Sequence, residues 1–420
     1  MNAPQQIQPR RILVRGTNWL GDAVMTTPAL MRLREKFPNA HITLLTPEKL
    51  ADLWENHPAI DAVESFNADE GVISVASKLR FSMAKEPIRK LHETFRETQA
   101  TTVTERVVEV TAATTNTLRE LLITDDLALV LPNSPRSAIE CWLARIPQRV
   151  GYARPWRNFF LTNAVAARAE AVKMRKRSVA EISSLVSGTG LQPVNHPNTG
   201  QRSVPPSNAH QIHEYLHLVA VLGANPEPMP PQLVVNPDEI EAAKKKFGLD
   251  VIGKPIFGLN PGAEYGPTKR WPVEKFIAAA RDIQNRTNCT WLTFGGKADL
   301  TIASRIAAAI ASPPLAIWNL AGRAKLRELM VLLKLCRVLL TNDSGPMHVA
   351  AALGTPVVVP FGSTSPELTG PGLPGDVRHH LLKSDAPCSP CFLRECPIDF
   401  RCMNGISVER VVEAVLQAIR

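Results

Sequence analysis

Short apolar runs alternate with helical patterns along this chain, and that alternation restricts the folds it can adopt. The run Arg11–Arg15 leads into a glycine-containing turn and then into a helical pattern over Ala23–Phe37. The next run is Ile42–Leu45, and a third, Asp126–Leu131, precedes a helical pattern over Arg136–Ala144. Strands that alternate with helices form parallel sheets with helices on both faces. The first half of the chain is therefore predicted to be an α/β unit.

The second half repeats this order. Its predicted strands are Pro255–Asn260, Thr290–Phe294, Arg337–Thr341 and Pro356–Phe361. Its predicted helices are Val273–Asn285, Leu300–Ala311 and Met347–Leu353. A Pro-rich stretch, Pro193–Pro237, with one helix around His210–Leu222, separates the halves. We predict two Rossmann-like parallel-sheet domains, residues 1–230 and 231–420, with a ligand cleft between them at the carboxyl ends of the strands.

Length and composition agree with a soluble enzyme of several domains. A chain of 420 residues suggests two or three domains. With 45% hydrophobic and 21% charged residues, it has neither a disordered nor a polytopic membrane profile. No uncharged apolar run reaches the roughly 18 residues that span a bilayer, and the polar, basic N-terminus argues against a secretory signal. Seven cysteines, an odd number, favour a reducing cytoplasm over a disulfide framework.

The net charge of +9 favours an anionic partner. Several cations gather in one helix-like run: Lys78, Arg80, Lys85, Arg89, Lys90 and Arg96. This run is either a solvated helix face or a patch for an anionic membrane surface. It lies in residues 74–122, where β-branched residues interrupt the helical pattern, and we interpret that segment as an insertion. No nucleic-acid motif accompanies the charge, and nucleic acid is not an expected partner.

The turn Gly16–Asp22 lies between a strand and a helix. Its glycines let backbone amides approach a ligand, and a helix N-terminus favours anions. The spacing lacks the third glycine of the dinucleotide-binding fingerprint, so a nicotinamide site is not expected. Asp22 is a candidate catalytic carboxylate, with helix capping as the alternative.

Two further turns combine amides with charged groups. The loop Asn260–Pro272 holds Lys269 and Arg270 just before a helix, which suits a diphosphate; a solvated basic loop is the alternative. The turn Thr341–His348 again joins a strand to a helix, and a similar turn is Pro360–Pro366. His348 could donate to a phosphate or simply pack in the core. These turns together predict a nucleotide-diphosphate site that needs no metal.

Four cysteines cluster near the C-terminus. Cys388, Cys391, Cys396 and Cys402 have a spacing that suits a tetrahedral thiolate site. The alternatives are a structural zinc ion or iron–sulfur cluster, and free or disulfide-linked thiols in a Pro-rich loop.

Taken together, these motifs resemble glycosyltransferase family 9. The resemblance rests on Gly21-Asp22 with Thr26–Pro28, Pro261–Ala263 with Lys269–Pro272, and Thr341–Gly345 with Met347–Ala351. It covers most of residues 11–65, 125–165 and 255–415. Within the family, Leu131–Ser134, Ile146-Pro147 and Arg149–Tyr152 are most similar to the members that add the second heptose of lipopolysaccharide.

The resemblance implies a GT-B fold whose C-terminal domain binds the donor. It implies an inverting transfer of L-glycero-D-manno-heptose from ADP-heptose to heptose I of the lipopolysaccharide inner core, without a catalytic metal or other cofactor. The acceptor would be the lipid A-core oligosaccharide, met at the cytoplasmic face of the inner membrane by a cytoplasmic, peripheral protein. The alternatives are transfer of the first or third heptose by the same family, a non-catalytic nucleotide-sugar-binding protein, and a nucleotide-sugar epimerase.

Site residues follow from the same resemblance. It makes Asp22 the catalytic base and Lys269 the donor-phosphate lysine. It places further donor contacts at Gly262, Ala263, Asp343, Ser344, Gly345 and His348. Asp299 falls near an acidic position that holds the ribose, although the family more often has Glu or a different spacing there. The resemblance identifies no acceptor-binding residues, because the N-terminal half diverges most.

Overall fold

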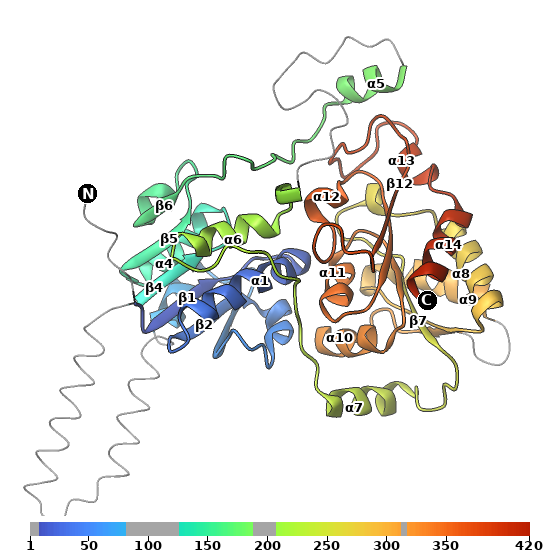
Figure 1. Cartoon of the computed structure of the whole chain (residues 1–420), viewed down its shortest axis with the longest axis horizontal. Coiled ribbons are helices and arrows are strands. Elements are labelled where there is room, and N and C mark those ends of the chain that lie inside the picture. Colours follow the sequence, from blue (N-terminus) through green and yellow to red (C-terminus); the bar gives the residue numbers. More distant parts are fainter. Residues whose placement is uncertain (1–7, 81–125, 188–206, 312–316) are drawn as a thin grey trace, which may run out of the picture. The chain divides into compact units, whose positions relative to one another are not determined.

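The structure is a computed structural model of the whole chain and describes residues 8–80, 126–187, 207–311 and 317–420. It divides into two units, each built on one six-stranded sheet whose paired strands are all parallel (Figure 1). The first unit comprises Met1–Asn18, Ala29–Arg168 and Tyr215–Pro226. The second comprises Trp19–Pro28, Ala169–Glu214 and Glu227–Arg420. The predicted α/β class with two parallel sheets is confirmed.

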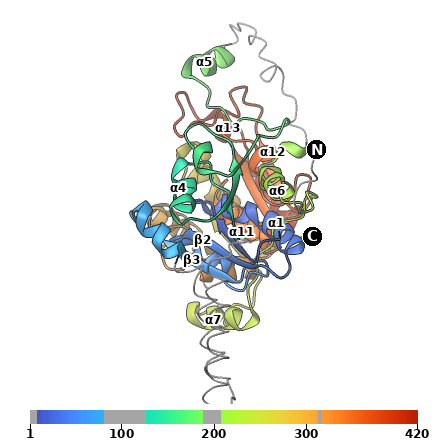
Figure 2. The same cartoon turned by 90° about the vertical axis from the view of Figure 1, so that its left-hand side faces the viewer.

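The sheet of the first unit has the order β3-β2-β1-β4-β5-β6, which is the Rossmann order. Its strands are β1 (Arg11–Arg15), β2 (His41–Pro47), β3 (Ala62–Phe66), β4 (Asp126–Val130), β5 (Gln148–Tyr152) and β6 (Asn163–Val165). Its helices are α1 (Leu20–Lys36), which begins in the second unit, α4 (Pro135–Leu143), α6 (Ile212–Ala220) and residues 72–80. Figure 2 shows α4 on one side of this sheet and α1 with α6 on the other.

The central strands of this unit are apolar without alternation because both of their faces are covered. Leu13 and Ala128 belong to a buried cluster that includes Cys141 of α4. Leu79, with Val75 and Ala76, joins the same cluster, so residues 72–80 contribute to the core of this unit. The remainder of the predicted insertion, 81–122, lies outside the described residues.

The sheet of the second unit has the order β12-β11-β10-β7-β8-β9, which is the same topology. Its strands are β7 (Ile256–Asn260), β8 (Thr290–Thr293), β9 (Ile317–Asn319), β10 (Leu339–Thr341), β11 (Val357–Phe361) and β12 (His380–Lys383). Its larger helices are α7 (Pro237–Phe247), α8 (Val273–Thr287), α9 (Leu300–Ile310), α10 (Leu326–Leu335), α11 (Gly345–Ala352) and α14 (Val408–Ala418). Strand order reverses between β7 and β10, which is where such sheets bind ligands.

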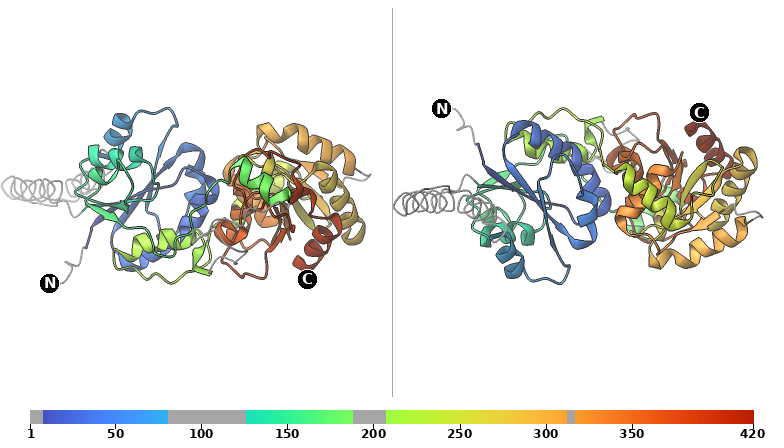
Figure 3. Two further views of the ribbon diagram at one scale, coloured as in Figure 1. Left: turned by 90° about the horizontal axis from the view of Figure 1, so that it is seen from above. Right: turned by 90° about the horizontal axis from the view of Figure 1, so that it is seen from below.

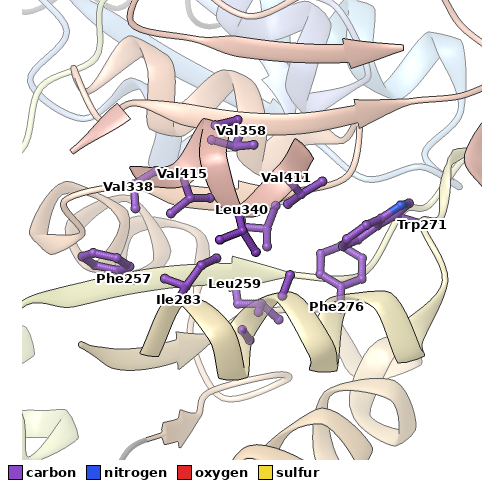
Figure 4. Packing of buried hydrophobic residues seen from close by; sticks show 14 of the residues in the cluster. Phe257, Leu259, Trp271, Phe276, Ile283, Val338, Leu340, Val358, Val411 and Val415 are labelled. Atoms are coloured by element: carbon purple, nitrogen blue, oxygen red, sulfur yellow. The ribbon is translucent and has the colours of Figure 1, made fainter. Parts of the chain in front are cut away.

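The core of the second unit forms between this sheet and helices α8, α9 and α14 (Figure 4). Leu259, Leu340 and Val358 project from neighbouring strands, and Phe276 of α8 meets Trp271 edge to face at 5.1 Å. The orange helices α10 and α11 lie on the other side of the sheet from the yellow α8 and α9 (Figure 3). The core thus fixes the strand ends from which the functional turns emerge.

Short elements complete the description. They are η1 (Glu48–Trp54), η2 (Asn158–Phe160), α5 (Val179–Ser187), η3 (Ser207–Ala209), η4 (Pro267–Lys269), η5 (Lys297–Asp299), α12 (Pro366–Thr369) and α13 (Arg401–Asn404). Within the described ranges, no helix combines the length and apolar character that crossing a membrane requires.

Candidate active site

Two loops meet where the strand order of the second unit reverses. Asn260, the last residue of β7, donates from Nδ2 to Thr341 Oγ1 at 3.0 Å and to Ser344 Oγ at 3.1 Å. Asn342, just after β10, donates to the carbonyl of Pro261 at 2.7 Å and accepts from the amide of Trp271 at 2.9 Å. These two amide side chains hold the loop after β7 against the turn after β10.

Lys269 and Asp343 form a salt bridge across those loops. Lys269 Nζ lies 2.6 Å from Asp343 Oδ2, and the two side chains are 14% and 4% exposed. Thr364 Oγ1, from the turn after β11, donates to the same carboxylate oxygen at 2.5 Å. The ring of Tyr265 lies 5.0 Å from the ammonium. The ammonium therefore has a fixed place and an oriented partner before any ligand arrives.

Asp299 packs against the loop that follows β7. A side chain at Gly262 would come within 2.4 Å of the Asp299 carboxylate, so the glycine lets this carboxylate lie close to the loop backbone. Asp299 Oδ2 accepts from the amide of Gly296 at 3.0 Å, and Oδ1 lies 3.7 Å from Arg270. Arg270 also donates to the carbonyl of the buried Ala263. The structure therefore brings Asp299 to the predicted diphosphate loop.

Asp22 lies in the first turn of α1, close enough to Lys269 for the lysine charge to affect its pKa. Gln211 Nε2, from the segment before α6, donates to Asp22 Oδ1 at 2.9 Å. Burial raises the pKa of the Asp22 carboxyl, and the bond from Gln211 and the charge of Lys269 lower it in part. A carboxylate whose pKa is moved toward neutrality suits a general base.

His348 packs directly against the turn that carries Asp22. A side chain at Gly21 would lie 2.8 Å from His348 Cδ2, and one at Gly345 would lie 2.8 Å from Leu20. His348 is only 6% exposed, and burial lowers its pKa to about 4. Its imidazole is therefore neutral at neutral pH and supplies no positive charge to a phosphate. The two glycines let the first turns of α1 and α11 touch.

The four clustered cysteines lie in the loop after β12 and in α13. All seven cysteines are free thiols, and Cys388, Cys391 and Cys402 are buried. Burial raises the pKa of these three thiols. Across the described ranges, no group of three or more His, Cys, Asp or Glu residues is arranged to hold a metal ion.

The cysteine loop, which carries Cys388, Cys391 and Cys396, forms hydrogen bonds with the predicted diphosphate loop, Asn260–Pro272. Tyr265 donates from its hydroxyl to the carbonyl of Phe392 at 2.7 Å. Thr268 Oγ1 donates to the carbonyl of Leu393 at 2.6 Å. The place of Lys269 therefore depends on this loop through two side-chain bonds.

The predicted basic run is described only at its start. Lys78 forms an ion pair with Glu70 at 2.8 Å, and Arg80 donates to the carbonyl of Leu143. The other members, Lys85, Arg89, Lys90 and Arg96, fall outside the described residues.

The sequence alone does not identify three residues near the site, Gln211, Thr364 and Tyr265. Gln211 contacts Asp22 from 189 positions away, and no local pattern marks such a contact. Thr364 lies in the predicted turn Pro360–Pro366, so its place could have been inferred, but its bond to Asp343 could not. Tyr265 lies in the predicted diphosphate loop, in which the sequence identifies only Lys269 and Arg270 as candidate binding side chains.

Two Rossmann-like units, each built on one parallel six-stranded sheet, define the architecture of a GT-B-like enzyme. The chain belongs to glycosyltransferase family 9 (heptosyltransferase), whose family model matches residues 184–400. The matched range includes Lys269, Asp299 and Asp343, whereas Asp22 lies before it. The resemblance found from the motifs is thereby confirmed at the level of the family.

Curated relatives cover most of the chain. The lipopolysaccharide heptosyltransferase 2 of Salmonella typhimurium is 28% identical over 367 residues, which are 86% of this chain and 85% of that protein. The protein of the same name from Escherichia coli is 28% identical over 364 residues, again 86% and 85%.

Solved structures share the fold. E. coli ADP-heptose lps heptosyltransferase II has a TM-score of 0.68 and 24% identity, covering 97% of this chain and 98% of that one. A family 9 glycosyltransferase from Veillonella parvula has a TM-score of 0.69 and 21% identity, covering 100% and 99%. The predicted GT-B architecture is confirmed.

Proposed function

We propose that this family 9 glycosyltransferase transfers L-glycero-D-manno-heptose from ADP-heptose to heptose I of the lipopolysaccharide inner core, with inversion. The observation that carries the proposal is the carboxyl of Asp22, whose pKa is raised by burial and which lies close enough to Lys269 to feel its charge. Relatives named heptosyltransferase 2 along 86% of the chain support the choice of donor and acceptor.

Asp22 acts in this proposal as the general base. It takes the proton from the acceptor hydroxyl as that oxygen attacks the anomeric carbon, while the ADP diphosphate leaves from the opposite face. Gln211 bonds to one carboxylate oxygen and leaves the other for the acceptor hydroxyl. Gln211 is therefore a positioning residue.

Lys269 acts on the leaving diphosphate. Its ammonium keeps hydrogen-bond donors beyond the one directed at Asp343, and these reach the phosphate oxygens as negative charge builds there. Asp343 orients the ammonium and is itself held by Thr364. Ser344 and Gly345 add backbone amides at the start of α11, where the helix N-terminus favours an anion.

The remaining donor contacts follow from the loop after β7. Gly262 lets the Asp299 carboxylate approach the loop closely. In this proposal Asp299 accepts from the ribose hydroxyls, and Gly262 and Ala263 contact the donor. His348, neutral and buried, supports Gly21 rather than the phosphate. Residues 231–420 are thus proposed as the donor domain, and residues 1–230, apart from Asp22, as the acceptor domain.

The acceptor and location are proposed from the same chemistry. A phosphorylated lipid A-core oligosaccharide is anionic and suits a chain with a net charge of +9. The protein would meet it as a cytoplasmic, peripheral protein at the inner membrane. Lys269 and the helix amides supply positive potential at the diphosphate, so no cofactor is required in the proposed reaction.

A product assay tests this function. Purified protein is given ADP-heptose with core acceptors that carry no heptose, one heptose or two, and products are identified by mass and anomeric configuration. We expect one heptose to be added, with inversion, only to the acceptor that carries one. Addition to either other acceptor would assign the chain to a different step in the same family. Donor interconversion without any acceptor would indicate an epimerase, and no turnover at all a binding protein.

A further inference from the structure

The first unit carries a group of exposed aromatic side chains that the proposed chemistry does not use. Trp156 is 90% exposed and Phe159 is 83% exposed, three positions apart in the segment between β5 and β6. Phe159 packs edge to face on Phe160 at 5.5 Å, and Phe160 packs in the same way on Trp142, which is 42% exposed. We name this group, with its neighbouring arginines Arg145, Arg149 and Arg154, the aromatic surface.

The fold holds these rings outward. Arg157, between the two exposed aromatics, is fully buried, with Nη2 donating to the carbonyl of Val130 at 3.3 Å and Nη1 to Asn133 Oδ1 at 3.4 Å. Trp156 adopts a φ of 63°, in the left-handed region that a non-glycine residue adopts only at a cost in free energy. A strained tryptophan pointing to solvent does nothing for the core. The strain therefore points to a function at the surface.

The charged residues along this stretch of the sequence are of one sign. From Cys141 to Ala169 the chain has five arginines and neither aspartate nor glutamate. Arg149 and Arg154 direct their guanidinium groups at backbone carbonyls, such as Phe160 O at 2.7 Å and Ala153 O at 3.0 Å. Arg145, Arg149 and Arg154 form no ion pair within the described part of the chain. No acidic partner in the described ranges therefore neutralises these charges, and Arg145 is exposed while Arg149 and Arg154 are half-buried.

We propose that the aromatic surface docks the protein on an anionic lipid bilayer. Tryptophan and phenylalanine rings favour the membrane–water interface, and an arginine near an anionic leaflet is attracted to it. A protein partner would call for a broader apolar area with charges of both signs, whereas this surface offers two protruding rings among cations. The inference rests on the proposed function, because an acceptor built on lipid A is presented at a membrane.

Vesicle sedimentation tests the surface without any acceptor. The full chain is mixed with phosphatidylethanolamine vesicles that contain or lack phosphatidylglycerol. We expect binding to the anionic vesicles that weakens with added salt, and a loss of about tenfold or more when Trp156→Ser and Phe159→Ser are combined, since each ring buries about 150–250 Å² at most. The matched control combines Val251→Ser and Val377→Ser, two apolar residues that are 76% and 88% exposed in the second unit. This control should bind as the parent does.

Several outcomes overturn the proposal. Absence of binding to anionic vesicles, equal loss in the control pair, or unchanged binding by the Trp156→Ser/Phe159→Ser protein would each do so. A dimer in solution that the same double variant dissociates would mark the surface as a self-association site instead. Thermal melts confirm that the variants fold. Transfer to a soluble truncated acceptor separates the two proposals: the double variant should retain it, and vesicle binding without any transfer would refute the function but not the surface.

Discussion

At the scale of the residue, the pKa of Asp22, the proposed base, depends on burial and on one hydrogen bond from Gln211. Burial raises the pKa of the Asp22 carboxyl, and the amide of Gln211 lowers it by bonding to the ionised form. His348, against the same turn, has a pKa of about 4 and carries no charge near neutral pH. Gln211 and Lys269 are therefore the polar groups that tune this base.

Asp22→Asn removes the base while keeping the shape of the side chain. We expect transfer to fall by about 10²–10⁴-fold, while ADP binding by calorimetry stays unchanged. The melting temperature should not fall, because burial disfavours the ionised carboxylate that the substitution replaces. Activity within threefold of the parent would remove Asp22 from the mechanism.

Gln211→Glu places a second carboxylate beside Asp22. Like charges raise the pKa of a carboxyl, so more of Asp22 should be protonated at a given pH. The acidic limb of the kcat/KM profile should therefore move to higher pH, with the plateau at high pH largely retained. Gln211→Met, of similar length, should move it less, because it removes only the hydrogen bond. A parallel drop at all pH values in both variants would indicate a merely structural role.

At the scale of elements, the position of Lys269 in the loop after β7 depends on Asp343 in the turn after β10. Lys269→Ala would leave the Asp343 carboxylate, 4% exposed, without its cation at the proposed diphosphate site. We expect weaker ADP-heptose binding by calorimetry and slower transfer, each by about tenfold or more. The double variant Lys269→Ala/Asp343→Asn should lose less donor affinity than Lys269→Ala alone.

The exposed Lys245 in α7 provides the control for that experiment. Lys245→Ala makes the same change in net charge in a helix that supplies none of the proposed donor contacts, and it should leave donor affinity unchanged. If Lys269→Ala also leaves affinity and rate unchanged, the loop is a solvated turn.

Elements differed in how well the sequence predicted them. The central strands β1, β4, β7 and β11 were predicted because both of their faces are buried, and the residues are apolar without interruption. The outer strands β6 and β9 have three residues each, too few to show a period. Helix α7 was missed although Asn236 and Glu239 form a capping box and Gly248 ends it.

The residues of the candidate site also differ in how well the sequence predicts them. Turn chemistry marked the loops of Lys269 and Asp343, because glycine, proline and charge coincide at strand ends. Contacts between distant segments, such as the one between Gln211 and Asp22, depend on the tertiary fold and left no local signal.

At the scale of the whole molecule, three buried histidines should make the free energy of unfolding depend on pH. Burial lowers the pKa of His210, His348 and His379 from 6.5 to about 4. The unfolded chain therefore takes up protons as the pH falls below 6.5, while the folded protein does not until about 4. The free energy of unfolding should decrease across that window, by roughly 1–3 kcal/mol per histidine.

Denaturant titrations between pH 7 and pH 4 measure this loss directly. His379→Gln, which removes one of the three groups outside the candidate site, should make the decline shallower. A free energy of unfolding that stays flat across the window would contradict the assignment.

Treatment with a chelator tests whether the stability of the whole molecule or the rate of the proposed reaction depends on a metal. If Lys269 and the amides of Ser344 and Gly345 supply the positive potential, a divalent ion at the diphosphate is redundant, and EDTA should leave the transfer rate nearly intact. A structural ion at Cys388, Cys391, Cys396 and Cys402 would behave differently. Its removal would lower the melting temperature, because metal binding is linked to folding.

The two effects separate when rate and melting temperature are measured on the same chelated sample. Thr268 and Tyr265 bond to the cysteine loop, so unfolding of that loop would also disturb Lys269. A slower rate that accompanies a lower melting temperature would therefore report the loop. A rate abolished by EDTA and restored by Mg²⁺ or Mn²⁺, in protein whose circular dichroism and melting temperature never change, would contradict the metal-free mechanism.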